Sequence, residues 1–508
     1  MSDLILGVSG LRGVVGETLT PEVAVRYAAA FGAWLQEREG EPTRVGVAAD
    51  GRRGWGEIHG AAIAGLRAVG CEVVNLGVVA TPTVGSAIDL NGLDGAIQVT
   101  ASHNPQQWNG LKCLVCPVTS PEKREAAAKL RSDVPAYLEW LREHAEEELG
   151  ARAPNQREAD QIIARFKASE TIRVSGEAGD IPPVGLDAVG QHVEQVEIYG
   201  GALFSSMPEP YGSGTIVVDS VNASGAKLVS VFAERHGIKL TQLAGETSGI
   251  FPHTPEPTAE NLSGAGGLCD AVPGLKADVG FAQDPDGDRL AIVDERGRYI
   301  GEEYTLAIAA EAILGAMGAE AKGAVLVTNL STSRMVEDVA AAYGARVERT
   351  AVGEANVVER MKALKAAGER VVLGGEGNGG VIWPEVTYVR DSLGAMALTL
   401  GVMARTGLSV SGLVAKIDGY ARAGKYSIVK RKQGIAHKAD AQPAVERVAA
   451  AYAAERVDRQ DGVQVDFGGA RAGSWVHVRA SNTEPIMRLI AEAARRGGRE
   501  RSSTRWRG

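Results

Sequence analysis

Three aspartates alternate in the segment ADVGFAQDPDGDRLAIVDERG, a spacing that could gather carboxylates around one divalent cation. Asp284, Asp286 and Asp288 offer hard oxygen ligands, and Arg289 follows them directly. An EF-hand calcium loop is an alternative because Glu295 completes its acidic pattern, but Arg289 stands where that loop needs glycine, and the flanks VGFAQ and LAIVD look like strands. A magnesium site is the favoured prediction, with an aspartyl nucleophile at Asp284 or a solvated acidic turn as alternatives.

A second candidate for chemistry is the loop TASHNPQQWNGLK, which follows the apolar run GAIQV. Ser102 could accept a phosphoryl group, because His103 offers a proton carrier and Lys112 a cation that attracts phosphate. Taken alone, Ser102 is better explained as a turn residue that bonds the local backbone. The two neighbouring side chains strengthen the case for a nucleophile.

Two further loops carry polar side chains at the ends of predicted strands. GGEGNGGV holds Glu376 and Asn378, which could bind sugar hydroxyls, although a plain turn explains this loop equally well. VRASNTEPIMR precedes a predicted helix with Glu484 and Pro485 in its first turn, an arrangement typical of a phosphate site, with a capping turn as the alternative. The candidate phosphate ligands are Arg479, Ser481, Asn482 and Thr483.

Together these loops resemble the four signature loops of the α-D-phosphohexomutases, which include phosphoglucomutase, phosphomannomutase and phosphoglucosamine mutase. TASHNP with NGLK, DPDGDR, GEGNGG and RASNTEP match them in the family's order. The segments SGLRGVVG, ADGR, VVDS, FPHTPEPTAENL and RTAVGEANV extend the resemblance to nearly the whole chain, from about Val8 to Glu492.

The resemblance implies a role for each matching residue. Ser102 matches the phosphorylated serine, which together with the three aspartates would ligate one Mg2+ per chain. Lys112 and Arg12 match residues implicated in proton handling or charge stabilisation near that serine, and His103 is expected to assist them. The expected substrate contacts are Glu376, Asn378, Arg289, Arg479, Ser481, Asn482 and Thr483.

The implied reaction interconverts a hexose 6-phosphate and a hexose 1-phosphate through a phosphoserine and a hexose 1,6-bisphosphate. GEGNGGVIWPE and SGLRGVVG look most like the phosphoglucosamine mutase branch, so glucosamine phosphates are the expected substrates, with mannose or glucose phosphates as the alternative. Many members have a histidine where this chain has Gly380, so their sugar preference does not transfer. A non-catalytic sugar-phosphate sensor and a magnesium-dependent phosphatase are alternatives from other classes.

Predicted strands and helices, which must position these loops, alternate along the chain. The β-rich runs RVGVAAD, TIVVDS, AVLVTN and VVLGGE are each followed by a helical pattern, which is typical of α/β units with largely parallel sheets. Predicted helices include PEVAVRYAAAFGAWLQE, with Thr20 as its N-cap, GEIHGAAIAGLRAVG and SRMVEDVAAAYG. In such sheets, ligands bind at the carboxyl ends of strands.

The resemblance implies an α/β fold of three similar α/β domains with mixed sheets and a smaller C-terminal α+β domain around a central cleft. Each expected domain carries one loop. Residues 1–195 carry the serine loop TASHNPQQWNGLK, 196–300 the metal loop DPDGDR, 301–419 the sugar loop GEGNGG and 420–508 the phosphate loop RASNTEP. We expect a charged, helical insertion at about 120–160 and an Arg-rich tail from Arg495.

The composition supports an enzyme with several domains. A chain of 508 residues, 44% apolar, is long enough for three or four domains. The net charge of −9 gives no reason to expect nucleic acid or a membrane as partner. The absence of a signal-like N-terminus predicts a cytoplasmic protein, and we expect it to be a monomer or a homodimer. Four scattered cysteines predict no disulfide framework, and Cys113 and Cys116 are expected to be buried thiols.

Overall fold

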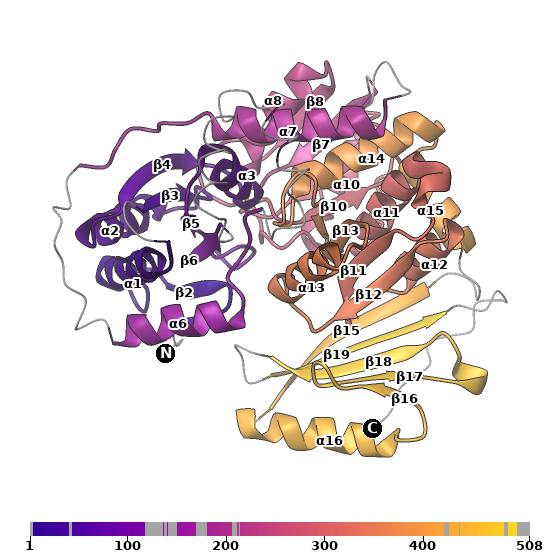
Figure 1. Cartoon of the computed structure of the whole chain (residues 1–508). Helices are drawn as coiled ribbons and strands as arrows, with labels where there is room; N and C mark the ends of the chain where they lie inside the picture. The colour runs from indigo at the N-terminus through magenta and orange to yellow at the C-terminus, as the bar shows by residue number, and fades with distance from the viewer. Residues whose placement is uncertain are drawn as a thin grey trace.

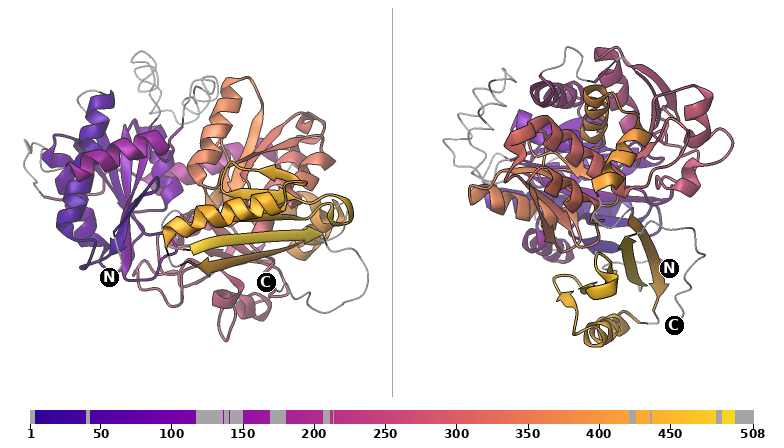
Figure 2. Two further views of the ribbon diagram at one scale, coloured as in Figure 1. Left: turned by 90° about the horizontal axis from the view of Figure 1, so that it is seen from below. Right: turned by 90° about the vertical axis from the view of Figure 1, so that its right-hand side faces the viewer.

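The computed structural model describes residues 4–39, 43–116, 136, 140, 150–168, 180–205, 211–212, 214–420, 426–435, 437–481 and 486–494. Four sheets follow one another along the chain (Figures 1 and 2). The first three mix parallel and antiparallel strands, and the fourth is antiparallel throughout. This architecture confirms the predicted fold class. Most of the predicted insertion and the Arg-rich tail lie outside the described residues.

The first three sheets share one arrangement: three parallel strands and an antiparallel strand beside the third. In spatial order the first contains β4 (Glu72–Val78), β3 (Arg44–Ala49), β5 (Gly95–Val99) and β6 (Trp108–Val115), extended by β2 (Gly10–Val14) and β1 (Ile5–Gly7). The second contains β8 (Lys239–Leu243), β7 (Thr215–Asp219), β9 (Val279–Gln283) and β10 (Leu290–Val293). The third contains β12 (Arg346–Thr350), β11 (Val325–Asn329), β13 (Val371–Glu376) and β14 (Gly380–Ile382).

Helices cover these sheets (Figure 1). Successive residues of β3 enter different cores: Val47 packs in the cluster that contains α1 and α2, whereas Ala48 packs in the cluster that contains α3 and α7. Burial on both faces explains why such strands are continuous apolar runs in the sequence. The helices are α1 (Pro21–Glu39), α2 (Trp55–Ala68), α3 (Thr81–Asn91), α6 (Gln156–Lys167), α7 (Ala188–Leu203), α8 (Gly225–Arg235), α9 (Ala259–Leu262), α10 (Leu268–Gly274), α11 (Glu303–Met317), α12 (Met335–Ala342), α13 (Glu354–Ala366), α14 (Ser392–Thr406) and α15 (Val410–Tyr420).

The segment after the phosphate loop is a strand, so the helix predicted there was wrong. β19 (Ile486–Ala494) pairs with β15 (Tyr426–Gly434) and β18 (Trp475–Ala480), and β17 (Val463–Asp466) and β16 (Arg456–Asp458) complete the sheet. Met487 packs in a core with α16 (Ala441–Ala451), whereas Glu492 is buried and accepts hydrogen bonds from Trp475 and Ser333. IMRLIAEAA does not alternate polar and apolar residues because the charged Glu492 is buried whereas Ala491 and Ala493 are exposed, and its alanines favour a helix in isolation.

A buried chain of hydrogen bonds joins the first and third domains. His192 of α7 bonds Thr83 of α3 through Nδ1 (2.9 Å) and Asp391, which caps α14, through Nε2 (3.1 Å). The metal loop lies between the same two helices: the N–H of Thr81 donates to the Asp286 carbonyl (2.8 Å), and the N–H of Ser392 donates to the Gly287 carbonyl (3.2 Å). The ends of α3 and α14 therefore fix the metal loop from two domains.

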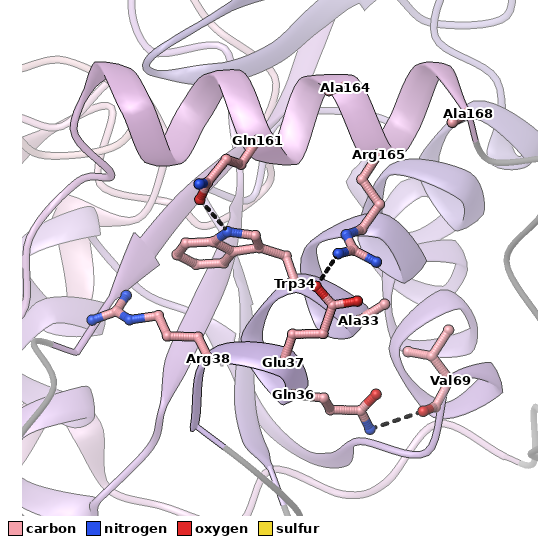
Figure 3. Close-up of a pocket in the computed structure, with 10 residues that line it drawn as sticks. All are labelled: Ala33, Trp34, Gln36, Glu37, Arg38, Val69, Gln161, Ala164, Arg165 and Ala168. Atoms are coloured by element: carbon pink, nitrogen blue, oxygen red, sulfur yellow. Dashed lines mark hydrogen bonds and ion pairs between the residues drawn. The ribbon is translucent and has the colours of Figure 1, made fainter.

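Helix α6 packs against α1 in the first domain. Its first turn is held by a capping box between Asn155 and Glu158, and one edge of α6 lines a pocket together with residues of α1 (Figure 3). Gln161 accepts a hydrogen bond from the Trp34 indole at 3.0 Å across this pocket. No single described helix is long and apolar enough to cross a membrane; α14 and α15 pass that test only as a pair, bent by 87°.

We predict that His192→Leu destabilises the junction between the first and third domains. The substitution removes both hydrogen bonds of a fully buried ring and leaves Asp391 short of a donor, so the free energy of unfolding should fall by about 1–3 kcal/mol. Denaturant unfolding measures this loss. His437→Asn, at an exposed position, is the matched control, and equal stability of both variants would contradict the prediction.

Candidate active site

The candidate site is built from four loops, each of which connects two neighbouring strands. The serine loop joins β5 to β6, the metal loop β9 to β10, the sugar loop β13 to β14 and the phosphate loop β18 to β19. In each of the first three sheets this is the same connection, from the third parallel strand to its antiparallel neighbour. The repeated topology therefore places each loop at an equivalent strand end.

Ser102 sits in a strained turn directly beside the metal loop. Its Oγ donates a hydrogen bond to Asp284 Oδ2 at 2.8 Å and lies 3.3 Å from Nδ1 of His103. The residue is 2% exposed and has a φ of 48°, a left-handed conformation that costs a non-glycine residue about 1–2 kcal/mol. The structure thus brings the predicted nucleophile and the predicted metal site into contact.

A buried ion pair holds the serine in this conformation. Arg52 pairs with Asp50 at 2.8 Å, with both side chains fully buried, and Arg52 also donates to the Ser102 carbonyl. The Thr100 hydroxyl donates to Asp50 (2.6 Å) and accepts the N–H of Ser102 (2.8 Å). These contacts oppose relaxation of the turn. In the sequence, ADGR was recognisable only as part of the resemblance, because the contacts that give Arg52 this supporting role join residues 50 positions apart.

The three aspartates form a compact, fully buried acidic group. Asp284, Asp286 and Asp288 can each offer one oxygen such that all three oxygens lie within 4.8 Å of one another. Asp286 Oδ1 and Asp288 Oδ1 have no hydrogen-bond partner, although both are buried. Buried carboxylate oxygens without donors are costly unless a cation binds them, so the donor set fits Mg2+.

The pKa values of Asp284 and Asp288 are shifted in opposite directions. Burial, followed by repulsion from Asp286 and Asp288, raises the pKa of Asp284 well above its usual range. Burial also acts to raise the pKa of Asp288, but the cations Arg390, Lys112 and Arg289 outweigh it and lower that pKa. A divalent cation would remove the cost of ionising Asp284.

The predicted cationic residues surround the serine and the aspartates. Lys112 Nζ lies 2.9 Å from Asp288 Oδ2 and 3.7 Å from Asp286 Oδ2; burial opposes its charge, but these carboxylates and Glu354 raise its pKa above the usual value. Arg12 donates to Asn104 in the serine loop at 3.0 Å.

Arg289 and His103, which were also predicted as site residues, lie beside the aspartates and Ser102. Arg289 Nε is 3.8 Å from Asp288 Oδ1. The positive charge of Arg289, followed by burial and by Arg12, lowers the pKa of His103 well below its usual value, so that its ring is neutral at pH 7. A neutral imidazole beside Ser102 can accept a proton.

The sugar loop is joined to the metal loop by Arg390, an arginine outside the four predicted loops. Arg390 donates to Glu376 Oε2 at 2.7 Å and to Asp288 Oδ2 at 2.6 Å. Asn378 Nδ2 lies 3.4 Å from the same Glu376 oxygen. A Cβ at Gly380 would lie 2.3 Å from Arg390 Cδ, so the arginine fills the space that a side chain at position 380 would need.

The phosphate loop is described only in part. Arg479 is 6% exposed, and its Nε lies 2.7 Å from Asp461 Oδ2; Ser481 is 5% exposed. Asp461 also accepts the N–H of Val352 at 3.1 Å, and the next residue, Gly353, donates to Glu376 Oε1 at 3.2 Å. The phosphate and sugar loops therefore flank one turn of the third domain. Asn482 and Thr483 lie outside the described residues, so their roles stay predictions.

Comparisons with known proteins agree with this geometry. Four family models match: phosphoglucomutase/phosphomannomutase α/β/α domain I over residues 3–131, domain II over 202–297, domain III over 302–420 and the C-terminal domain over 427–500.

Similar whole chains were also found. A phosphoglucomutase/phosphomannomutase of Thermococcus kodakarensis is 32% identical over 96% of this chain and 94% of its own length. A protein described as "probable phosphoglucosamine mutase" from Methanopyrus kandleri is 31% identical over 96% and 93%. The solved structure of a phosphoglucomutase/phosphomannomutase family protein from Burkholderia thailandensis, 25% identical, has a TM-score of 0.72 and covers 97% of this chain and 94% of its own.

We predict that Asp286→Asn weakens Mg2+ binding at least about 10-fold, because it removes one negative charge from the buried acidic group while conserving its shape. Isothermal titration of the purified protein with Mg2+ measures the effect. Asp270→Asn, at an exposed position of α10, should bind Mg2+ as the unaltered protein does. Equal affinities for the two variants would argue against a metal site here.

We predict that Thr100→Val lowers kcat by about 10- to 100-fold while leaving Mg2+ affinity unchanged. Valine conserves the shape but loses both hydroxyl contacts that hold the Ser102 turn. A mutase assay and a Mg2+ titration give the two readouts. Thr100→Ser retains the hydroxyl and should stay close to the original rate, and a fully active Thr100→Val protein would refute the positioning role.

Proposed function

The chain belongs to the phosphoglucomutase/phosphomannomutase family and is a phosphohexomutase, and we propose that it works through a phosphorylated Ser102 and a hexose 1,6-bisphosphate. The observation that carries this proposal is the 2.8 Å contact between Ser102 Oγ and Asp284 Oδ2. It puts an alcohol oxygen at the edge of a carboxylate group suited to Mg2+, which is what transfer of a phosphoryl group to and from a serine requires.

In the first half of the proposed reaction, a hydroxyl of the hexose phosphate attacks the phosphorus on Ser102. The bond from phosphorus to Oγ breaks, and a 1,6-bisphosphate forms. In the second half, Ser102 Oγ attacks the other phosphate and releases the isomeric monophosphate. Because such transition states are loose, positioning and charge neutralisation account for most of the catalysis.

The charges needed for this step surround Ser102. Lys112, Arg12 and Arg289 supply positive charge beside the reacting phosphoryl group. Mg2+ held by the three aspartates would withdraw negative charge from the phosphoryl oxygens. His103, neutral and 3.3 Å from Ser102 Oγ, is placed to relay the proton: in the first half the attacking sugar hydroxyl loses its proton while the leaving Oγ gains one, and in the second half Ser102 loses its proton while the leaving sugar oxygen gains one.

The other two loops are proposed to hold the substrate. Glu376 and Asn378 bind sugar hydroxyls, and the loop around Arg479 and Ser481, with Asn482 and Thr483, clamps the phosphate that is not reacting. Since the bisphosphate must turn between the half-reactions, the clamp has to accept either phosphate. A site that recognises the phosphate group instead of one face of the sugar meets this requirement.

Glucosamine 6-phosphate and glucosamine 1-phosphate are the proposed substrates. Support comes from the form of the glycine-rich loop and from the similar proteins described as phosphoglucosamine mutases. The relative from T. kodakarensis, described as a phosphoglucomutase/phosphomannomutase, makes glucose and mannose phosphates the alternative.

We predict reversible isomerisation without net release of phosphate, and loss of nearly all activity in Ser102→Ala, because alanine has no oxygen to carry the phosphoryl group. The assay combines Mg2+, a trace of hexose 1,6-bisphosphate and glucosamine, glucose or mannose 6-phosphate, and follows 1-phosphate and free phosphate. The sugar with the highest kcat/KM identifies the substrate. Unchanged activity in Ser102→Ala would overturn the mechanism, and steady release of phosphate would indicate a phosphatase instead.

A further inference from the structure

A single buried guanidinium joins the metal loop to the sugar loop. Arg390, 7% exposed, has one terminal nitrogen 2.6 Å from Asp288 Oδ2 and the other 2.7 Å from Glu376 Oε2, and its Nε lies 3.4 Å from Glu354 Oε2. Three carboxylates from three segments therefore share one planar cation. The fork geometry of arginine suits this task, whereas a lysine could not bond two separated carboxylates equally well.

The position of Arg390 is fixed by its backbone. Its N–H donates to Glu354 Oε1 at 3.1 Å, and the N–H of the next residue, Asp391, donates to the Val381 carbonyl at 2.7 Å. The Asp391 side chain accepts from His192 in the junction of the first and third domains. The guanidinium thus reaches the site from a rigid base, and its Cδ occupies the space beside Gly380.

We propose that Arg390 is a positioning residue that fixes Glu376 for sugar binding and is not needed for the metal. The proposal rests on the function proposed above. Glu376 Oε1 is held by Asn329 (2.8 Å) and by the Gly353 N–H, but its Oε2 is held at short range by Arg390. Without that contact the carboxylate can rotate, and the geometry offered to a sugar hydroxyl is lost.

The metal site responds differently to loss of Arg390. Asp288 Oδ2 also accepts from Lys112, so this carboxylate stays anchored, and Oδ1 remains without a hydrogen-bond partner and available to a cation. Removing a positive charge 2.6 Å from Asp288 also reduces repulsion of Mg2+. Weaker sugar binding with retained or tighter Mg2+ binding is therefore the signature of this role, because general damage to the site would weaken both.

The test compares Arg390→Gln with the unaltered protein. KM for the preferred hexose 6-phosphate should rise at least about 10-fold, and the dissociation constant for Mg2+, from isothermal titration, should stay within about threefold or fall. An unchanged KM, or loss of sugar and Mg2+ binding together, would overturn the proposal. Arg405→Gln, on α14 and bonded to the Gly315 carbonyl, is the matched control and should change neither value.

Three further substitutions, Arg390→Lys, Arg390→Ala and Gly380→Ala, keep the test decisive if Arg390→Gln does not fold. Arg390→Lys retains the charge but loses the fork, and should give an intermediate rise in KM. Gly380→Ala places a methyl group against Arg390, so this single substitution should raise KM. In the double variant with Arg390→Ala it should raise KM no further than Arg390→Ala does, and additive effects would contradict the proposal. If the unaltered protein isomerises no hexose phosphate, the proposed function fails; if it does and Arg390→Gln has the same KM, only this inference fails.

Discussion

Three carboxylates buried within 4.8 Å of one another repel each other strongly, and much of the site serves to offset that repulsion. Lys112 and Arg390 both contact the Asp288 carboxylate. The backbone N–H groups of Asp288 and Arg289 donate to Asp284 at 3.1 Å. Two oxygens are still without donors. The same shortage of positive charge that makes this group costly to fold makes it suitable for a divalent cation and a phosphoryl group.

The contributions of the four domains are separate but interlocked. Each domain supplies one strand connection. Ser102 contacts Asp284 directly, Arg390 bridges Asp288 and Glu376, and the turn at Val352 links the sugar and phosphate loops. Helices α3 and α14 hold the metal loop by its backbone, so the position of this loop depends on the packing of two other domains.

Site residues could be predicted from the sequence where they lie close together in the chain, but not where they come together only in the fold. The aspartates lie within five residues of one another, and TASHNP and GEGNGG each lie in one turn, so their residue types alone indicated a site. Arg390 is 102 residues from Asp288, and Arg52 is 50 residues from Ser102, so neither contact is visible in a local pattern. Strand β19 was predicted as a helix because its buried position 492 is a glutamate and its exposed positions 491 and 493 are alanines, so the polar–apolar alternation that marks a strand is absent.

The identical placement of the serine, metal and sugar loops on their sheets has an evolutionary consequence. A loop that closes two adjacent strands can change its length or composition while the strands keep their register, so one chemical task can diversify without disturbing the others. In the proposed mechanism, selectivity for the sugar resides in a different domain from the nucleophile and the metal loop. New substrates could thus be acquired by altering a single hairpin, with the phosphoryl-transfer apparatus inherited intact.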